Sequence, residues 1–233
     1  MQDLTRPIVA EFVGTFALVF VGGATIMNGY VASAPVPLLD IAAAHGLIMA
    51  LMVTATMRIS GHLNPAVTVG IAVARRLSPS HAVVYVVSQC AGAVLAALAL
   101  KALFPPAAAH EARLGGQWVA ANVGMGRAIV LEAIATFFLV FVAFGTLVDS
   151  RGPKVGGFAI GLTVTAGILA IGPLTGASMN PARSFGPALV SGNFDGHLIY
   201  WLGPIAGGIA AGLLYEWAFL QREPASSPRG RHE

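Results

Sequence analysis

The tripeptide Asn-Pro-Ala occurs twice, and the stretches around the two copies resemble each other. The copies are Asn64-Pro65-Ala66 and Asn180-Pro181-Ala182, 116 positions apart. A similar offset of 121 positions relates Glu11 to Glu132, each of which stands three residues before an Ala/Gly-Thr-Phe segment. Such steady offsets indicate a duplicated unit. The chain is therefore expected to fold as two halves of similar structure.

Six apolar runs are long enough to cross a bilayer, which takes roughly 20 residues of helix. They cover 7–30, 36–57, 79–104, 127–148, 155–174 and 197–220. Only 10% of the residues are charged and 56% are hydrophobic, whereas a soluble domain carries about 25% charged residues. The composition therefore predicts an all-α membrane protein. Gly92 and Gly207, at equivalent places in the third and sixth runs, suit close helix packing.

Each half contains three of these runs, and an odd number forces the second half to enter the membrane upside down. This predicts an inverted 3+3 repeat, with the functional site near the midplane where the halves meet. The repeats cover about 7–104 and 127–220 within a single channel domain, 1–222. The segment 223–233, rich in Pro, Ser and Arg, is predicted to be a disordered cytoplasmic tail.

The two Asn-Pro-Ala segments are predicted to start helices. Asn caps a helix N-terminus well, and Pro suits the first turn because its missing N–H would have had no partner there. The apolar stretch after each copy is about ten residues, enough for half a bilayer. The two re-entrant half-helices would meet head to head, each presenting roughly half a positive charge. Such a centre opposes cations and protons and admits neutral molecules with acceptor oxygens.

A single Asn-Pro-Ala is an ordinary helix start; two copies at the repeat offset are much more specific. At these residues the chain resembles the aquaporin, or major intrinsic protein, family, with a match over about 210 residues. The resembling segments are Ile59–Thr68 and Ser178–Ser184. The resemblance implies a right-handed helical bundle, an hourglass pore in each subunit, a homotetramer in the bilayer and transport without energy coupling, cofactor or catalysis.

The resemblance also implies a selectivity ring of four residues outside the midplane. Carried over position by position, these are His45, Ile168, Ala177 and Arg183. His45 aligns only if a one-residue deletion lies in the loop before the first motif, where the family usually has Ser-Gly-Gly-His and this chain has Ser60-Gly61-His62. The ring resembles that of plant vacuolar (tonoplast) aquaporins, so the constriction is expected to pass water and also ammonia.

Further residues are expected to line or support the pore. Glu11 and Glu132 lie inside spans, where a carboxylate is costly; a proton relay is one interpretation, and support of the loop amides before each Asn is the favoured one. Gln117, in the outer loop, is expected at the pore mouth. The predicted pore-lining loop residues are Gly61, His62, Gly176 and Ser178.

The leading function is thus a passive channel for water and small neutral solutes, closed to protons and ions. A glycerol or small-polyol facilitator is an alternative, although Ser184, Ala188 and Tyr200-Trp201 resemble the water-selective members. A coupled transporter is another, since inverted repeats with broken helices also build those. No nucleophile–base pair or metal-ligand cluster points to an enzyme or a metal site. The net charge of +3 comes from scattered basic residues, which disfavours nucleic-acid binding.

Basic residues in the short loops predict the orientation. With both termini in the cytoplasm, nine basic residues face inward and three outward, with Arg183 placed in the pore. The inward set is Arg6, Arg58, Arg75, Arg76, Arg151, Lys154, Arg222, Arg229 and Arg231; the outward set is Lys101, Arg113 and Arg127. The Ala- and Arg-rich composition and short termini favour a bacterial inner membrane.

Overall fold

The structure, a computed structural model, describes residues 4–220, and within them every regular element is a helix. The predicted tail 223–233 lies outside the described residues. The elements are α1 (Thr5–Val31), α2 (Leu38–Thr56), α3 (Pro65–Val73), α4 (Pro79–Leu103), α5 (Pro106–Glu111), η1 (Arg113–Gly115), α6 (Met125–Ala143), η2 (Phe144–Val148), α7 (Gly156–Thr175), α8 (Pro181–Ser191) and α9 (Ile199–Ala218).

Six long helices correspond to the six predicted spans. Five of them are long and apolar enough to cross a membrane by length and composition: α1, α2, α4, α7 and the continuous stretch Met125–Val148 formed by α6 and η2. The sixth, α9, has 20 residues. It covers most of the sixth predicted run, 197–220. The fold is therefore an all-α membrane protein with six spans.

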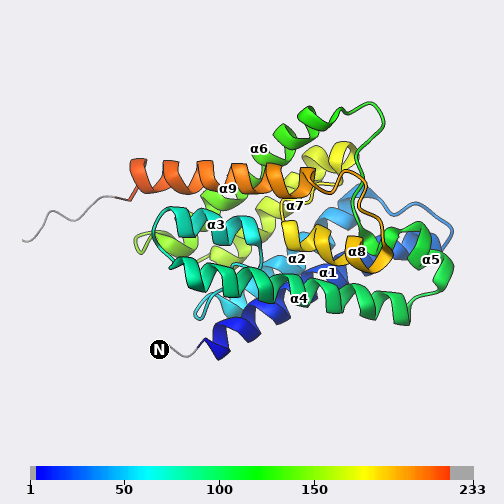
Figure 1. Ribbon diagram of the computed structural model, residues 1–233, viewed down its shortest axis with the longest axis horizontal. Helices are drawn as coiled ribbons and strands as arrows, with labels where there is room; N and C mark the ends of the chain where they lie inside the picture. Colours follow the sequence, from blue (N-terminus) through cyan, green and yellow to red (C-terminus); the bar gives the residue numbers. More distant parts are fainter. Residues whose placement is uncertain (1–3, 221–233) are drawn as a thin grey trace, which may run out of the picture.

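Two short helices, α3 with 9 residues and α8 with 11, lie end to end in the middle of the bundle. Figure 1 shows them between α9 on one side and α4 on the other. Each comes after a long helix of its own half and is too short to span, as predicted for half-helices. Their N-termini meet near the centre, so the functional site belongs there.

Glycines allow the long helices of each half to approach closely. A Cβ added at Gly92 of α4 would collide with the Phe12 carbonyl oxygen of α1. At the equivalent position, a Cβ on Gly207 of α9 would collide with the Ala133 carbonyl oxygen of α6. The predicted role of Gly92 and Gly207 in close helix packing is confirmed, and it is the same in both repeats.

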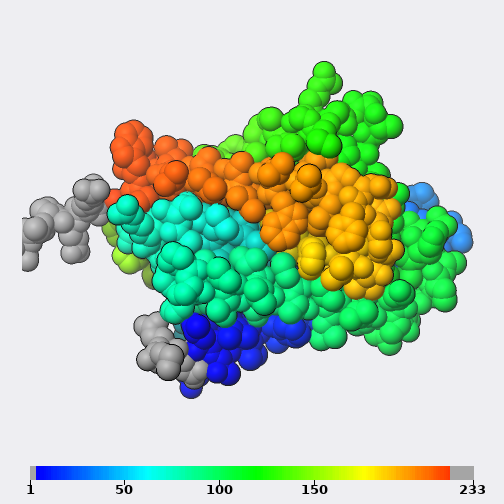
Figure 2. All heavy atoms as spheres, in the orientation of Figure 1, coloured from blue at the N-terminus to red at the C-terminus, as the bar shows by residue number. Residues whose placement is uncertain are grey.

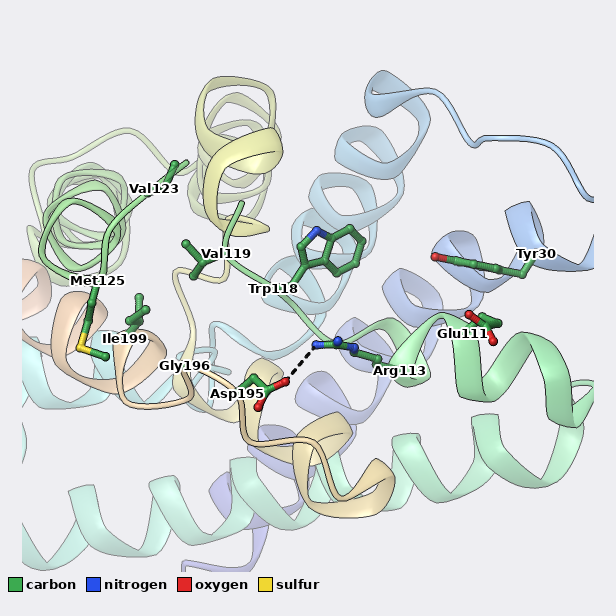
Figure 3. Close-up of a pocket in the computed structure, with 10 residues that line it drawn as sticks. All are labelled: Tyr30, Glu111, Arg113, Trp118, Val119, Val123, Met125, Asp195, Gly196 and Ile199. Atoms are coloured by element: carbon green, nitrogen blue, oxygen red, sulfur yellow. Dashed lines mark ion pairs between the residues drawn. The ribbon is translucent and has the colours of Figure 1, made fainter. Parts of the chain in front are cut away.

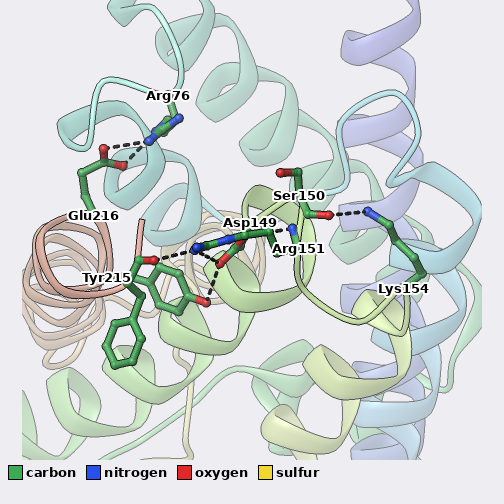
Figure 4. Close-up of polar contacts among 8 residues, drawn as sticks. Arg76, Asp149, Ser150, Arg151, Lys154, Tyr215 and Glu216 are labelled. Atoms are coloured by element: carbon green, nitrogen blue, oxygen red, sulfur yellow. Dashed lines mark hydrogen bonds and ion pairs between the residues drawn. The ribbon is translucent and has the colours of Figure 1, made fainter. Parts of the chain in front are cut away.

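Ion pairs and hydrogen bonds link the ends of several helices at one end of the molecule (Figure 4). Arg76, after α3, makes two 2.8 Å hydrogen bonds to Glu216 of α9. Arg151, in the loop before α7, binds Asp149 and donates to the Phe219 carbonyl at the end of α9. Its hydrogen bonds lower the pKa of the Asp149 carboxyl to about 2, so the pair stays ionised at neutral pH.

Candidate functional site

Each half-helix begins at its Asn-Pro pair. Asn64 Oδ1 accepts a hydrogen bond from the Ala66 amide at 2.8 Å. Asn180 Oδ1 accepts from the amides of Ala182 and Arg183 at 3.1 and 3.3 Å. Both Asn side chains therefore satisfy amides that a helix N-terminus leaves without partners, and the predicted helix starts are confirmed.

The amide nitrogens of the two Asn side chains link the halves of the protein. Asn64 Nδ2 donates to the Met179 carbonyl at 2.7 Å, and Asn180 Nδ2 donates to the Leu63 carbonyl at 2.8 Å. Each bond crosses from one repeat to the other. A carboxamide nitrogen has two hydrogens, so each Asn keeps one that these contacts do not use. This reciprocal bracing was not predicted from the sequence.

The loop before each half-helix has an unusual backbone. Leu63, Ala177 and Met179 have positive φ values of 52°, 45° and 52°, a region that side chains with a Cβ enter rarely. These residues are nevertheless buried, with at most 1% exposure. The conformation turns consecutive N–H groups away from regular secondary structure, so each loop needs acceptors supplied from elsewhere in the fold.

A buried glutamate supplies those acceptors in the first repeat. Glu11 Oε1 accepts from the amides of Gly61 and His62 at 3.0 and 2.9 Å, and Oε2 accepts from the Leu63 amide at 2.6 Å. Gln89 of α4 donates to the same Oε2 at 2.6 Å and to Thr68 Oγ1 at 2.9 Å. Sequence reasoning missed Gln89; an amide side chain alone in an apolar span was the signal.

Glu132 occupies the equivalent position in the second repeat. Its Oε1 accepts from Thr175 Oγ1 at 2.7 Å and from the Ser178 amide at 2.9 Å. Its Oε2 accepts from the Met179 amide at 2.8 Å. Tyr200 extends the network by donating to the Thr175 carbonyl at 2.9 Å. These contacts are those of a loop-supporting carboxylate, and all the donors come from the loop or its adjoining helix end.

His45 of α2 and Arg183 of α8 lie next to each other, although 138 positions separate them. His45 Nδ1 is 2.8 Å from the Ile41 carbonyl, and Nε2 is 2.8 Å from Arg183 Nη2. A carbonyl can only accept and a guanidinium can only donate, so the geometry assigns a neutral imidazole with its hydrogen on Nδ1. The guanidinium is thereby held against α2.

The residues of the predicted ring line one narrow cavity together with both capping Asn side chains. Its volume is about 10 Å³, close to the smallest that holds a single water molecule. The sequence-predicted residues along it are His45, Asn64, Ile168, Ala177, Ser178, Asn180 and Arg183. Apolar side chains from four long helices, including Leu18 and Val164, complete the wall. The cavity thus combines an apolar wall with a few polar groups from α2 and the two half-helices.

Gln117 reaches Arg183 from the loop between η1 and α6. With the amide oriented so that its oxygen faces the guanidinium, Gln117 accepts from both Nη atoms of Arg183, at 3.2 Å from Nη2, and donates to Ser184 Oγ at 2.6 Å. This orientation follows from the partners, because the guanidinium has no acceptor. Gly176, with φ of 78°, makes room, since a Cβ there would lie 2.8 Å from that of Gln117.

The remaining predicted loop residues differ in position. Ser178 lines the cavity, and its hydroxyl lies 2.5 Å from Ser184 Oγ. Gly61, with φ of 89°, provides a turn and donates its amide to Glu11. His62 is 9% exposed, with Nδ1 at 3.1 Å from Thr68 Oγ1 and its ring packed edge-on against Tyr85. His62 is not among the residues that line the narrow cavity.

A wider pocket of about 500 Å³ opens at the end of the molecule opposite the Arg76–Glu216 pair (Figure 3). Tyr30, Trp118 and Met125 border it, and an ion pair of 3.8 Å joins Arg113 Nη1 to Asp195 Oδ2. Arg113 also donates to Asn193 Oδ1 at 3.4 Å. These contacts connect the segment between α5 and α6, which carries Gln117, to the segment between α8 and α9.

The chain is similar to proteins of known family over nearly its whole length. The family model described as major intrinsic protein matches residues 1–215. Aquaporin TIP4-4 of Zea mays is 42% identical over 224 residues, covering 92% of this chain and 87% of the relative. Aquaporin-4 of Bos taurus is 41% identical, covering 94% and 68%. The aquaglyceroporin of Plasmodium falciparum superposes with a TM-score of 0.80 at 20% identity, covering 93% and 97%.

Proposed function

Because the chain belongs to the major intrinsic protein family, whose members include channels for water, we propose that it is a water channel that also admits ammonia and excludes protons and ions. One observation carries the proposal. His45, Ile168, Ala177 and Arg183 line the same narrow cavity as the capping side chains of both half-helices. A molecule that crosses the protein along this cavity meets the ring and then the midplane.

Water fits the polar groups on this path. The unused N–H of each capping Asn can donate to a water oxygen, while Leu18, Val164 and Ile168 offer it no competing hydrogen bonds. A passing molecule is thus oriented at a few points and bound weakly elsewhere. Rapid conduction requires this combination of favourable entry and easy release.

Ammonia is close to water in size and is likewise neutral. The ring residue Ile168 is apolar and Ala177 is small, so these two side chains neither donate nor accept hydrogen bonds with a passing molecule. The Arg183 guanidinium is drawn towards His45 and Gln117 by hydrogen bonds. We propose that this leaves a path wide enough and apolar enough for ammonia.

Exclusion of cations rests on two fixed positive fields. Arg183 is charged at any physiological pH, and the N-termini of α3 and α8 lie next to each other, linked through their capping Asn side chains. Each helix N-terminus is equivalent to roughly half a positive charge. A cation would have to shed water in a cavity of about 10 Å³ while facing both fields.

Proteoliposomes provide the test of this function. We expect osmotic shrinkage, followed by stopped-flow light scattering, to be faster than in empty liposomes and to have a low activation energy. We expect ammonia to alkalinise the lumen faster as well. The variant Ile168→His narrows the ring and adds a polar group, so ammonia flux should fall while water flux persists; Ile168→Val, which keeps an apolar ring, is the matched control.

Shrinkage no faster than in empty liposomes would contradict the water channel. Fast shrinkage without fast alkalinisation would retain the water channel and remove ammonia from the proposal. Glycerol, supplied in a third assay, should cross more slowly than either, and a flux that responds to a proton or sodium gradient would indicate a coupled transporter.

We also propose that the protein is a homotetramer of single channel domains, 1–222, with both termini in the cytoplasm. The orientation is supported by the basic residues of the loops, of which nine would face the cytoplasm and three the other side. Arg76 and Arg151 lie at one end of the bundle and Arg113 at the other, as this topology requires. The bacterial inner membrane stays a prediction from composition. Labelling of variants that lack Cys90 and carry one cysteine at position 58 or 113, from each side of intact vesicles, tests the orientation.

A further inference from the structure

A groove of about 720 Å³ separates the C-terminal end of α3 from the last turns of α9. Its residues are Val73, Ala74, Arg75, Arg76, Leu213, Glu216, Trp217 and Leu220. Figure 2 shows the two helices, in cyan and orange, side by side on the surface at this end of the molecule. The groove shares no lining residue with the narrow cavity, so the proposed conduction path uses none of its side chains.

The groove carries one uncompensated positive charge. Arg76 is neutralised by Glu216, to which it makes two hydrogen bonds of 2.8 Å. Arg75 is exposed, and within residues 4–220 no carboxylate lies within ion-pair distance of it. The guanidinium of Arg75 is thus available to an anion, and its planar donors match the oxygens of a phosphate group.

The position of Arg75 in the chain is also unusual. It follows the end of α3 with a φ of 61°, in the left-handed region. After α8, the half-helix of the other repeat, the left-handed residue is Gly192, with φ of 76°. Glycine is the usual residue at such a helix end because it has no Cβ to clash. At the end of α3, the protein instead presents a long cationic side chain.

Apolar side chains flank the charge. Trp217 is 83% exposed and Leu213 is 51% exposed, and Val73 faces them from α3. They lie at the end of a membrane-crossing helix, where indole rings favour the headgroup level and leucines favour the acyl chains. A free phosphate ion would use only the arginine, whereas a phospholipid would use the arginine, the indole and the aliphatic wall together.

We propose that this groove binds an anionic phospholipid, with its headgroup phosphate on Arg75 and an acyl chain along Val73 and Leu213. The choice of an anionic lipid follows from charge complementarity, since the Arg76–Glu216 pair adds no net charge. In the orientation proposed above, the site lies at the cytoplasmic end of the bundle, where anionic lipids attract basic residues.

The test uses Trp217 as the reporter. The chain has three tryptophans, so Trp118→Phe combined with Trp201→Phe leaves Trp217 alone in the full-length protein. The protein is reconstituted into vesicles that contain dibrominated phosphatidylglycerol or dibrominated phosphatidylcholine, whose bromines quench nearby indoles. We expect phosphatidylglycerol to be preferred at Trp217 by about fivefold, the contribution of one basic residue near a membrane surface.

Substitutions assign this preference to Arg75. Arg75→Gly removes the charge and relieves the backbone, so the protein should fold and the preference should disappear. Arg75→Lys, which keeps the positive charge, should keep most of the preference for phosphatidylglycerol. Arg58→Gly, which removes an exposed arginine from the loop after α2, is the matched control and should leave the preference intact.

Three results would overturn the proposal. The first is equal quenching by the two lipids, and the second is an equal loss of preference in Arg75→Gly and Arg58→Gly, which would indicate a diffuse surface potential. The third is displacement of phosphatidylglycerol by millimolar inorganic phosphate, which would indicate a free-anion site. If the double Trp variant does not fold, native mass spectrometry of the otherwise unchanged chain replaces the quenching assay. Retained phosphatidylglycerol should then fall in Arg75→Gly, and an unchanged amount would overturn the proposal.

Discussion

Replacing Glu132 by glutamine is expected to destabilise the second pore loop and to remove most of the water permeability. Both oxygens of Glu132 act as hydrogen-bond acceptors. Their donors are Thr175 Oγ1, the Ser178 amide and the Met179 amide. Glutamine has one oxygen and one NH₂ group, so in either orientation a donor faces a backbone N–H. The side chain is 0% exposed, and no solvent reaches the orphaned amide.

The cost should be on the order of 2–4 kcal/mol of unfolding free energy, because a buried donor without an acceptor loses about 1–3 kcal/mol and the amide clash adds to it. SDS titration of the purified protein measures the stability, and stopped-flow scattering measures the permeability per molecule. Glu111→Gln, the same change on the exposed helix α5, is the control and should alter neither. Normal water flux in Glu132→Gln would show that the loop keeps its shape without the carboxylate.

Replacing Arg183 by valine is expected to turn the channel into a cation leak while water still passes. Arg183 is 5% exposed and borders a cavity of about 10 Å³. A unit charge about 4 Å from a passing cation contributes about 4 kcal/mol at an effective dielectric constant of 20. Because each 1.4 kcal/mol off a barrier is about tenfold in rate, its removal should raise cation flux by up to about a thousandfold, within the limit imposed by the half-helix N-termini.

Proton flux is measured with a pH-sensitive dye enclosed in liposomes under a valinomycin-clamped potential, and sodium flux is measured with a tracer. Arg127→Val removes one exposed arginine from the N-terminal end of α6 and should leave the leak at the level of the unchanged protein. If proton and sodium fluxes through Arg183→Val equal those of the unchanged protein, the dipoles of the two half-helices alone form the barrier, and Arg183 serves only to orient the solute.

Agreement between the sequence and the structure is greatest where the controlling interactions are local. Asn64-Pro65 and Asn180-Pro181 start helices because the cap and the first turn are within three residues of each other in the chain. The number of long helices and the inverted halves follow from the lengths of the apolar runs and from the repeat offset. α9 is shorter than the predicted run 197–220 because the segment after α8 closes as turns before Ile199.

The placement of the ring residues could be predicted only through family resemblance. No local sequence pattern predicts that His45, Arg183 and Gln117 are in contact. Because one residue is missing before His62, the alignment alone also did not fix which residue of α2 belongs to the ring. The structure brings His45 Nε2 within 2.8 Å of Arg183 Nη2 and places both on the narrow cavity with Ile168 and Ala177.

The sequence by itself thus determined the membrane environment, the duplicated topology and the two capped half-helices, because composition, periodicity and capping act over a few residues. Only the tertiary structure decided how the halves join. Asn64 binds the Met179 carbonyl and Asn180 the Leu63 carbonyl across separations of 115 and 117 residues, and Gln89 completes the acceptor network of Glu11. Such partners depend on the close helix approach that glycines permit and on loop backbones that no periodic pattern encodes.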